Sequence, residues 1–255
     1  MTRLARQISD TGFYHVYFRG VNHCHLFEED NDYDKMLYLL ARIKDEIAIE
    51  VHAYCLMSNH VHLLIRENNP RQIVLAMRKL LGPYAIWFNK KYERSGALIA
   101  NRYQSKPVST DAYLVSLVRY IHQNPVEAGI VDQRQDYRWS SYCGYFEEHP
   151  QLVETTLVLN MFSKDRRTAL DEFTAFHVFQ ETDDYSTLGT TRKTEQQIHS
   201  AMIEDTGIAS LHSIASIQKP ERDSMIVSLR KQGFTVRQIE RATGISRGTI
   251  TRAKE

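Results

Sequence analysis

Long apolar runs are missing from this sequence of 255 residues. The opening residues, MTRLARQISD, contain no apolar core of the kind that signal peptides carry, and no later run is long enough to cross a bilayer. Cysteine is scarce too, because only three cysteines occur, widely spaced and without a CxxC pair. No disulfide framework is therefore expected, and a reducing cytoplasm is the predicted location.

Internal repeats, low-complexity tracts and a strong overall charge are also absent, since the formal net charge is only +1. The charge is nevertheless unevenly distributed. Residues 66–106 contain nine Lys/Arg against two Asp/Glu, residues 145–185 contain three against nine, and residues 219–255 contain nine against four. Two basic segments separated by an acidic one are typical of a chain that binds the phosphates of a nucleic acid through two separate regions. The alternative is that solvated helix faces produced these blocks by chance.

Apolar spacing predicts an α+β first domain. Residues 13–21 read as a strand, 23–47 as an amphipathic helix, and 49–65 as two strands around Met57–Asn59. Residues 70–93 read as a helix with a break at Pro83, and 111–123 as a helix ended by Asn124–Pro125. This order predicts a ferredoxin-like antiparallel sheet with helices on one face.

Three parts are predicted along the chain: a first domain at 1–145, an acidic helical extension and linker at 146–196, and an all-α domain at 197–255. The last part reads as a helix ending at Gly233, a second helix starting at Thr235 and a third capped by Ser246. Two short helices across a Gly-containing turn indicate a helix-turn-helix unit. Its last helix would present the following side chains to duplex DNA: Arg247, Thr249, Thr251 and Arg252. A small helical bundle with basic faces is the alternative.

The stretch SNHVHLLI, residues 58–65, places two histidines two positions apart. Side chains alternate between the faces of a strand, so His60 and His62 would lie side by side on one face. Such a pair is a candidate metal site. Zinc hydrolases also use His-x-His, often with an Asp two residues further on, but that position is Leu64 here. No other zinc-ligand spacing is evident in the sequence.

A second chemistry for the pair is a nuclease site in which a tyrosine attacks a phosphodiester beside a divalent cation. The segment VRYIHQNPVEAG supplies Tyr120 and Asn124, which are four residues apart and so share a helix face. The Asn124 amide oxygen would complete a ligand set with the two histidines. Tyr113, on the same helix, is the rival nucleophile, while helical spacing points His122 elsewhere.

Several of these stretches resemble one family. LMSNHVHLLI, RYIHQNPVEAGIV and YRWSSY, with FRGVNHCHLF and NRYQSKPV, are similar to the REP-associated tyrosine transposases of the single-tyrosine HUH superfamily, named for His-hydrophobic-His. The similarity covers about residues 12–145. Ser58 and Glu127 stand where these proteins often carry proline and a basic residue.

The resemblance implies a function. Tyr120 would be the nucleophile, His60 and His62 metal ligands, and Asn124 the third ligand of Mg²⁺ or Mn²⁺. The substrate would be single-stranded DNA with palindromic hairpins, cleaved through a 5′-phosphotyrosine intermediate by a monomer or homodimer. DNA-backbone contacts are expected from residues in the family-like stretches, namely Arg19, Arg102 and Lys106. The alternatives are an inactive DNA-binding regulator of hairpin repeats and, third, a zinc hydrolase.

Overall fold

The computed structural model describes residues 7–178, 217–231, 239–240, 243 and 245–253. The chain divides into two compact units, residues 1–188 and 189–255. None of the described helices is both long and apolar enough to cross a membrane. The elements of the first unit, in chain order, are β1 (Phe13–Arg19), η1 (Val21–His23), α1 (Asp30–Ile47), β2 (Glu50–Met57), β3 (His60–Arg66), α2 (Gln72–Lys91), β4 (Gln104–Pro107), α3 (Asp111–Glu127), η2 (Arg134–Asp136), η3 (Cys143–Phe146), α4 (Thr156–Leu159) and α5 (Arg166–Val178).

The strands form one antiparallel sheet in the order β2-β3-β1-β4, which confirms the predicted α+β class and ferredoxin-like order. β2 and β3 make the expected hairpin, with Met57 opposite His60. The edge strand β4 was not predicted. Its sequence, QSKP, has no apolar alternation and ends in proline, as short edge strands often do, so composition did not distinguish it from the surrounding loop.

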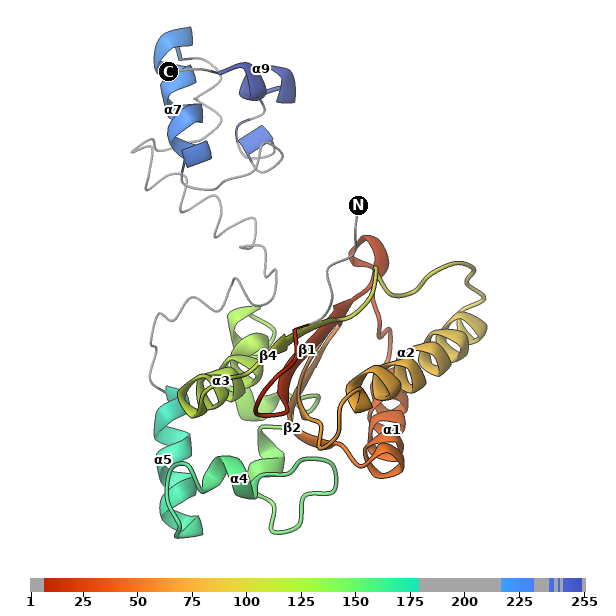
Figure 1. Ribbon diagram of the computed structural model, residues 1–255. Helices are drawn as coiled ribbons and strands as arrows, with labels where there is room; N and C mark the ends of the chain where they lie inside the picture. The colour runs from red at the N-terminus through yellow and green to blue at the C-terminus, as the bar shows by residue number, and fades with distance from the viewer. Residues whose placement is uncertain (1–6, 179–216, 232–238, 241–242, 244, 254–255) are drawn as a thin grey trace. The chain divides into compact units, whose positions relative to one another are not determined.

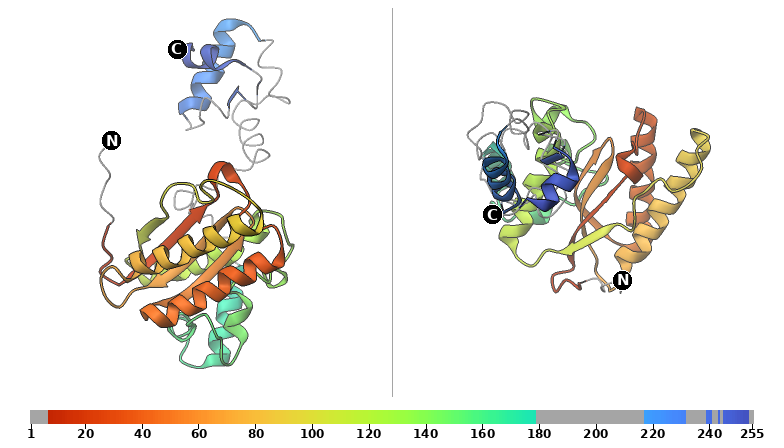
Figure 2. Two further views of the ribbon diagram at one scale, coloured as in Figure 1. Left: turned by 90° about the vertical axis from the view of Figure 1, so that its right-hand side faces the viewer. Right: turned by 90° about the horizontal axis from the view of Figure 1, so that it is seen from above.

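The prediction of helices on one face was wrong, because both faces of the sheet are covered. α1 and α2 pack against each other on one face, as Figures 1 and 2 show. α3 lies on the other face, against β2 and β3. The β3 residues Val61, Leu63 and Ile65 are fully buried. The sheet is therefore an inner layer, and a site on the α3 face is enclosed between the sheet and that helix.

Two prolines that were expected to stop helices lie inside them: Pro83 in α2 and Pro125 in α3. A proline in a helix interior costs ~3 kcal/mol, so tertiary packing must offset the loss. Tyr84, beside Pro83, is fully buried and its hydroxyl donates to Leu26 O at 2.5 Å. In α3 the hydrogen bonds resume beyond the proline, since Ala128 N donates to Asn124 O at 2.9 Å.

The acidic segment extends the hydrophobic core of the first unit. α5 packs against α3 and α4, and the fully buried Phe173 of α5 stacks on Tyr145, with ring centroids 4.5 Å apart. Residues 146–178 therefore contact the sheet-bearing part of the chain directly. The remaining residues of the predicted linker lie outside the described ranges.

The second unit contains α7 (Lys219–Lys231) and α9 (Arg247–Arg252) among its described residues. Ser246 caps α9 as expected, because its side chain accepts a hydrogen bond from Thr249 N. Of the predicted middle helix only Ile239, Glu240 and Thr243 are described, and all three are helical. The Gly233 end and the Thr235 start lie outside the described ranges, so the helix-turn-helix stays a prediction.

Buried neutral histidines should make the protein acid-sensitive. Burial lowers the pKa of His15 to about 3 and that of His177 to about 3. It also lowers the pKa of His52, and that of His122 well below its usual value. Unfolding returns each ring to a pKa of ~6.5, so below that pH the unfolded chain binds protons while the folded chain keeps these histidines neutral. Below pH ~6.5 the free energy of unfolding should fall by up to ~1.4 kcal/mol per pH unit for each histidine.

Urea denaturation between pH 7.5 and 5 measures this loss. Above pH ~6.5 these histidines should not contribute to the change in the free energy of unfolding with pH. The variant His52→Phe should lose less stability per pH unit below pH ~6.5 than the wild type, by about the contribution of one histidine. A free energy of unfolding that stays constant between pH 6.5 and 5 would contradict neutral burial.

Candidate active site

His60 and His62 lie side by side on the α3 face of the sheet, as predicted. His60 begins β3, and the two ring centroids are 5.1 Å apart with an interplanar angle of 88°. His62 is 3 % exposed and stands opposite Cys55 of β2 and Tyr17 of β1. Each histidine is thus held by a central strand, a rigid position for a ligand.

The Nδ1 atoms of both rings have polar partners, which leaves the Nε2 atoms as the candidate metal-binding nitrogens. His60 Nδ1 is 2.7 Å from Asn59 Oδ1, and His62 Nδ1 is 2.9 Å from His15 Nε2. His60 Nε2 is buried, with no hydrogen-bond partner in bonding geometry among the described residues. A histidine that binds a metal through one nitrogen usually has the other held in this way. The pair therefore fits a divalent cation.

Both imidazoles are neutral near pH 7. Burial lowers the pKa of His60 to about 4, partly opposed by the polar side chain of Asn124, which favours the protonated ring. Burial, together with the positive charges that His15 and His60 would carry, holds the pKa of His62 well below its usual value. A neutral ring keeps a lone pair for a metal, whereas a protonated ring has none. The low pKa values therefore leave both rings ready to bind a cation.

α3 brings Tyr120 and Asn124 to these histidines. The Tyr120 ring meets His62 edge-on, with centroids 5.5 Å apart at 86°, and Tyr120 is 7 % exposed. Asn124 Nδ2 donates to Tyr120 O at 2.7 Å, so its Oδ1 is available as a ligand oxygen. The influence of Asn124 on the pKa of His60 places its side chain beside that ring. The structure thus brings together all four residues that the sequence indicated.

Other tyrosines compete with Tyr120 as nucleophile. The predicted rival, Tyr113, lies in the first turn of α3, about 10 Å from Tyr120 along the helix axis. Tyr17 was missed by sequence reasoning. Its ring stacks on His62 with centroids 6.0 Å apart, and it lies 5.1 Å from the His15 ring. Among the described residues, Tyr17 and Tyr120 are therefore the two tyrosines in ring contact with His62.

Two of the predicted DNA contacts lie at this site. Arg19 ends β1 opposite His60, is exposed, and its charge lowers the pKa of His60. Lys106 stands opposite His15 on β4, with its Nζ 6.0 Å from the centre of the Tyr17 ring. Arg102 is exposed in the loop before β4. The site therefore has two cations at its border.

The remaining predicted contacts belong to the second unit, on the short helix α9. Thr249 is half-buried there, and its hydroxyl is 3.1 Å from that of Ser246. Arg252 is exposed and donates from Nε to Gly248 O at 2.9 Å. Arg247 begins α9, and its side chain lies outside the described part of the structure.

His15 is a second residue of the site that sequence reasoning missed. It is fully buried on β1 and is the partner of His62 Nδ1. If His62 is to offer Nε2 to a metal, its Nδ1 must carry the proton and donate it to His15 Nε2. The only sequence signal was its place in FYHVYFRG, two residues before Tyr17, which does not reveal which strand pairs beside it.

Replacing His15 by phenylalanine should weaken divalent-metal binding, because it removes the acceptor that fixes the His62 ring. Loss of such an outer partner typically costs ~10–100-fold in metal affinity. Isothermal titration of the purified protein with Mn²⁺ measures the change. His52→Phe, which replaces a fully buried histidine near the other end of β2, is the matched control and should bind Mn²⁺ normally. Equal affinities for the His15 and His52 variants would remove His15 from the site.

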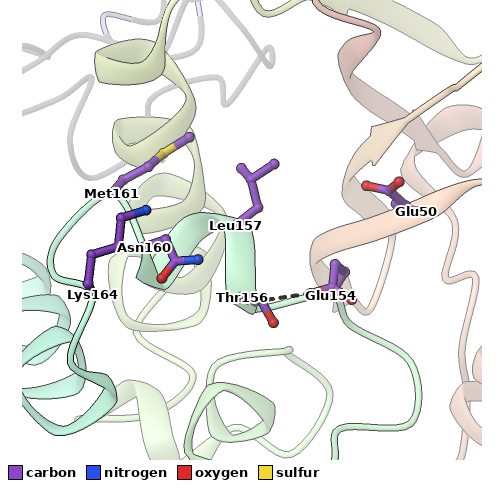
Figure 3. Close-up of a pocket in the computed structure, with 7 residues that line it drawn as sticks. All are labelled: Glu50, Glu154, Thr156, Leu157, Asn160, Met161 and Lys164. Carbon is purple, nitrogen blue, oxygen red and sulfur yellow. Dashed lines mark hydrogen bonds between the residues drawn. The ribbon is translucent and has the colours of Figure 1, made fainter.

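A closed zinc site is not built here. Within the described ranges, no three His, Cys, Asp or Glu side chains converge where a metal ion could sit. A separate cavity of about 610 Å³ lies beside α4, with Thr156 N donating to Glu154 Oε1 at 3.1 Å (Figure 3). It also borders Glu50, which pairs with Arg66 at the end of the hairpin remote from His60. This cavity is not part of the histidine site.

A comparison with protein families matches the part of the chain that carries this site. Residues 10–124 match the family described as "Transposase IS200 like". No curated protein matches the chain.

Two solved structures resemble it. The first is described as a REP-associated tyrosine transposase bound to a REP hairpin, with 16% identity and a TM-score of 0.49, covering 59% of this chain and 90% of the other. The second is a candidate transposase from Deinococcus radiodurans, with 21% identity and a TM-score of 0.33, covering 48% and 97%. Neither likeness is close enough to transfer a mechanism.

The family match covers all four strands and ends at Asn124. It therefore includes both histidines and Tyr120, and it agrees with the motifs that resemble the REP-associated tyrosine transposases. Residues 10–124 of this chain are therefore similar to the IS200-like transposases.

Proposed function

We propose that the protein is a metal-dependent, single-stranded DNA endonuclease and strand transferase of the HUH type, acting on palindromic hairpin DNA. The observation that carries this proposal is the contact of the Tyr120 ring with His62, beside His60 and Asn124. A hydrolase that activates water does not need a tyrosine nucleophile at its metal ligands. A tyrosine nucleophile requires that placement.

His60 and His62 would hold a divalent cation through Nε2, and Asn124 through Oδ1. Such an ion, Mg²⁺ or Mn²⁺, supplies charge that polarises the scissile phosphate. Two histidine nitrogens alone suit softer ions, so the choice of metal rests on the family resemblance. Arg19 and Lys106 at the border of the site would bind DNA phosphates, and Arg102 would bind a further phosphate of the same strand.

Tyr120 Oη would attack the phosphorus atom while the bond from phosphorus to the 3′-oxygen breaks. The products are a 5′-phosphotyrosine and a free 3′-hydroxyl, to which the tyrosine proton is finally transferred. A tyrosine hydroxyl has a pKa of ~10, so positioning and phosphate polarisation must drive the attack. One phosphoester replaces another, and a second strand end can reverse the step.

We further propose that the chain has the three parts outlined from its sequence: a catalytic domain at 1–145, an acidic extension and linker at 146–196, and a helix-turn-helix domain at 197–255 that binds duplex DNA. The capped helix α9 and the basic charge of residues 219–255 support the last assignment. The free state of all three cysteines is compatible with a reducing cytoplasm.

The test uses end-labelled single-stranded hairpins taken from palindromes beside the gene, incubated with full-length protein and Mg²⁺ or Mn²⁺. A labelled band at the mass of protein plus DNA, on a denaturing gel, is the expected result, and EDTA should abolish it. Tight hairpin binding without any band would favour the inactive regulator. Zinc-dependent turnover without a band would favour the hydrolase.

A further inference from the structure

A buried chain of hydrogen bonds joins α5 to α3 on the side of α3 away from the candidate active site. His122 of α3 is fully buried, and its Nδ1 is 3.1 Å from His177 Nε2 on α5. His122 Nε2 is 2.8 Å from Ser141 Oγ, which accepts a hydrogen bond from Tyr54 N of β2 at 2.9 Å. Sheet, catalytic helix and acidic segment are thus connected.

The hydrogen bonds determine the tautomers of His122 and His177 when both rings are neutral. His177 Nδ1 is 2.8 Å from Phe173 O, a carbonyl that only accepts, so the proton lies on His177 Nδ1. His177 Nε2 must then accept from His122 Nδ1. His122 Nε2 then presents its lone pair to the Ser141 hydroxyl, which also lies 3.3 Å from Tyr54 O. The hydrogen bonds at Phe173 O and between the two rings hold both rings in defined orientations.

Two arginines strengthen the same junction. Arg119 of α3 donates from Nη1 to Phe176 O at 3.4 Å, and its guanidinium lies 4.2 Å from the centre of the Phe176 ring. Arg134 donates from Nη2 to His177 O at 2.8 Å. Cations are favourable at the C-terminal carbonyls of a helix such as α5. Arg119 directly precedes Tyr120, so the junction holds the turn that carries the nucleophile.

We propose that this α5 clamp, formed by Arg119, His122, Arg134 and His177, positions the helix that carries Tyr120 and Asn124. This inference rests on the proposed function. The family match ends at Asn124, so α5 lies beyond the matched residues. His122 lies two residues from both Tyr120 and Asn124 on the opposite side of α3, where it acts without touching substrate. Because a displacement of ~1 Å of a reacting group can slow a reaction by ~10²-fold, a clamp that holds α3 in place would affect the rate of attack by Tyr120.

Two substitutions of His177 separate positioning from packing. Gln reaches as far as the imidazole Nε2 and keeps an acceptor for His122, whereas Asn reaches only as far as Nδ1 and keeps the bond to Phe173. In the full-length protein, His177→Asn should slow formation of the hairpin adduct by ~10–10²-fold with unchanged hairpin affinity. His177→Gln should retain a rate within a few-fold of the wild type.

Phe162→Leu is the control for general loss of stability. The Phe162 ring packs on Phe173 and Phe176 in the same cluster, and it has no hydrogen-bonding group. It should lower the melting temperature while leaving the adduct rate intact well below that temperature. Hydrogen exchange adds a readout independent of catalysis: amides 118–124 should exchange faster in His177→Asn than in Phe162→Leu.

The outcomes separate the clamp from the proposed function. A normal adduct rate in His177→Asn overturns the clamp and leaves the nuclease standing, as does an equal loss in Phe162→Leu. A faster rate in His177→Asn would mean that α5 restrains the site, which also overturns positioning. If the wild type forms no adduct, the nuclease proposal fails. Unchanged exchange at 118–124 in His177→Asn would then reject the clamp independently, and faster exchange there would support it.

Discussion

Tyr120→Phe should abolish the protein–DNA adduct while leaving hairpin binding intact. The substitution removes one oxygen and keeps the ring that packs against His62 and His15. Without the hydroxyl no phosphotyrosine can form, and removal of a nucleophile lowers turnover by at least ~10³-fold. The measurement is the labelled band on a denaturing gel, with hairpin affinity followed by fluorescence anisotropy on the same samples.

Tyr17→Phe and Tyr113→Phe are the matched controls. Tyr17 also stacks on His62 but belongs to the sheet, and Tyr113 shares α3 with Tyr120. Both control variants should form the adduct at close to the wild-type rate. A band that survives in Tyr120→Phe and vanishes in Tyr17→Phe would move the nucleophile to β1.

His62→Ala should remove most divalent-metal binding and with it the adduct. His62 is anchored by β1 and β2 on either side and by His15 at Nδ1, so no neighbouring ring can take its place. The loss of Mn²⁺ affinity should exceed the ~10–100-fold expected for the outer partner His15. Titration calorimetry with Mn²⁺ measures it without DNA.

His25→Ala provides the control for this variant. His25 is exposed and lies near Glu28, with its Nδ1 3.4 Å from the carboxylate. Its replacement should change neither Mn²⁺ affinity nor adduct formation. If His62→Ala bound Mn²⁺ as well as His25→Ala does, the histidine pair would not be the metal site.

Alternation and helical spacing were enough to predict the β2–β3 hairpin, α1 and the class of fold. They failed where tertiary packing overrides local preference. Pro83 and Pro125 lie inside helices because buried neighbours such as Tyr84 hold them there. β4 escaped notice because an edge strand pairs through its backbone and does not need apolar side chains.

The residues of the site also fall into those that local sequence spacing predicts and those that only tertiary packing reveals. His60 with His62, and Tyr120 with Asn124, are close in sequence, so the periods of a strand and a helix predicted each pair. His15 and His177 could not be found, since they are 47 and 55 residues from their partners, His62 and His122. Only the register of the sheet and the packing of α5 bring them there.

The central claim is that a tyrosine of α3 becomes joined to DNA. We would digest the wild-type adduct with trypsin and nuclease and locate the nucleotide-bearing residue by mass spectrometry. Phosphate-linked nucleotide on Tyr120 is the predicted result. Nucleotide on another residue, or cleaved hairpin with a free 5′-phosphate and no modified peptide, would contradict the account.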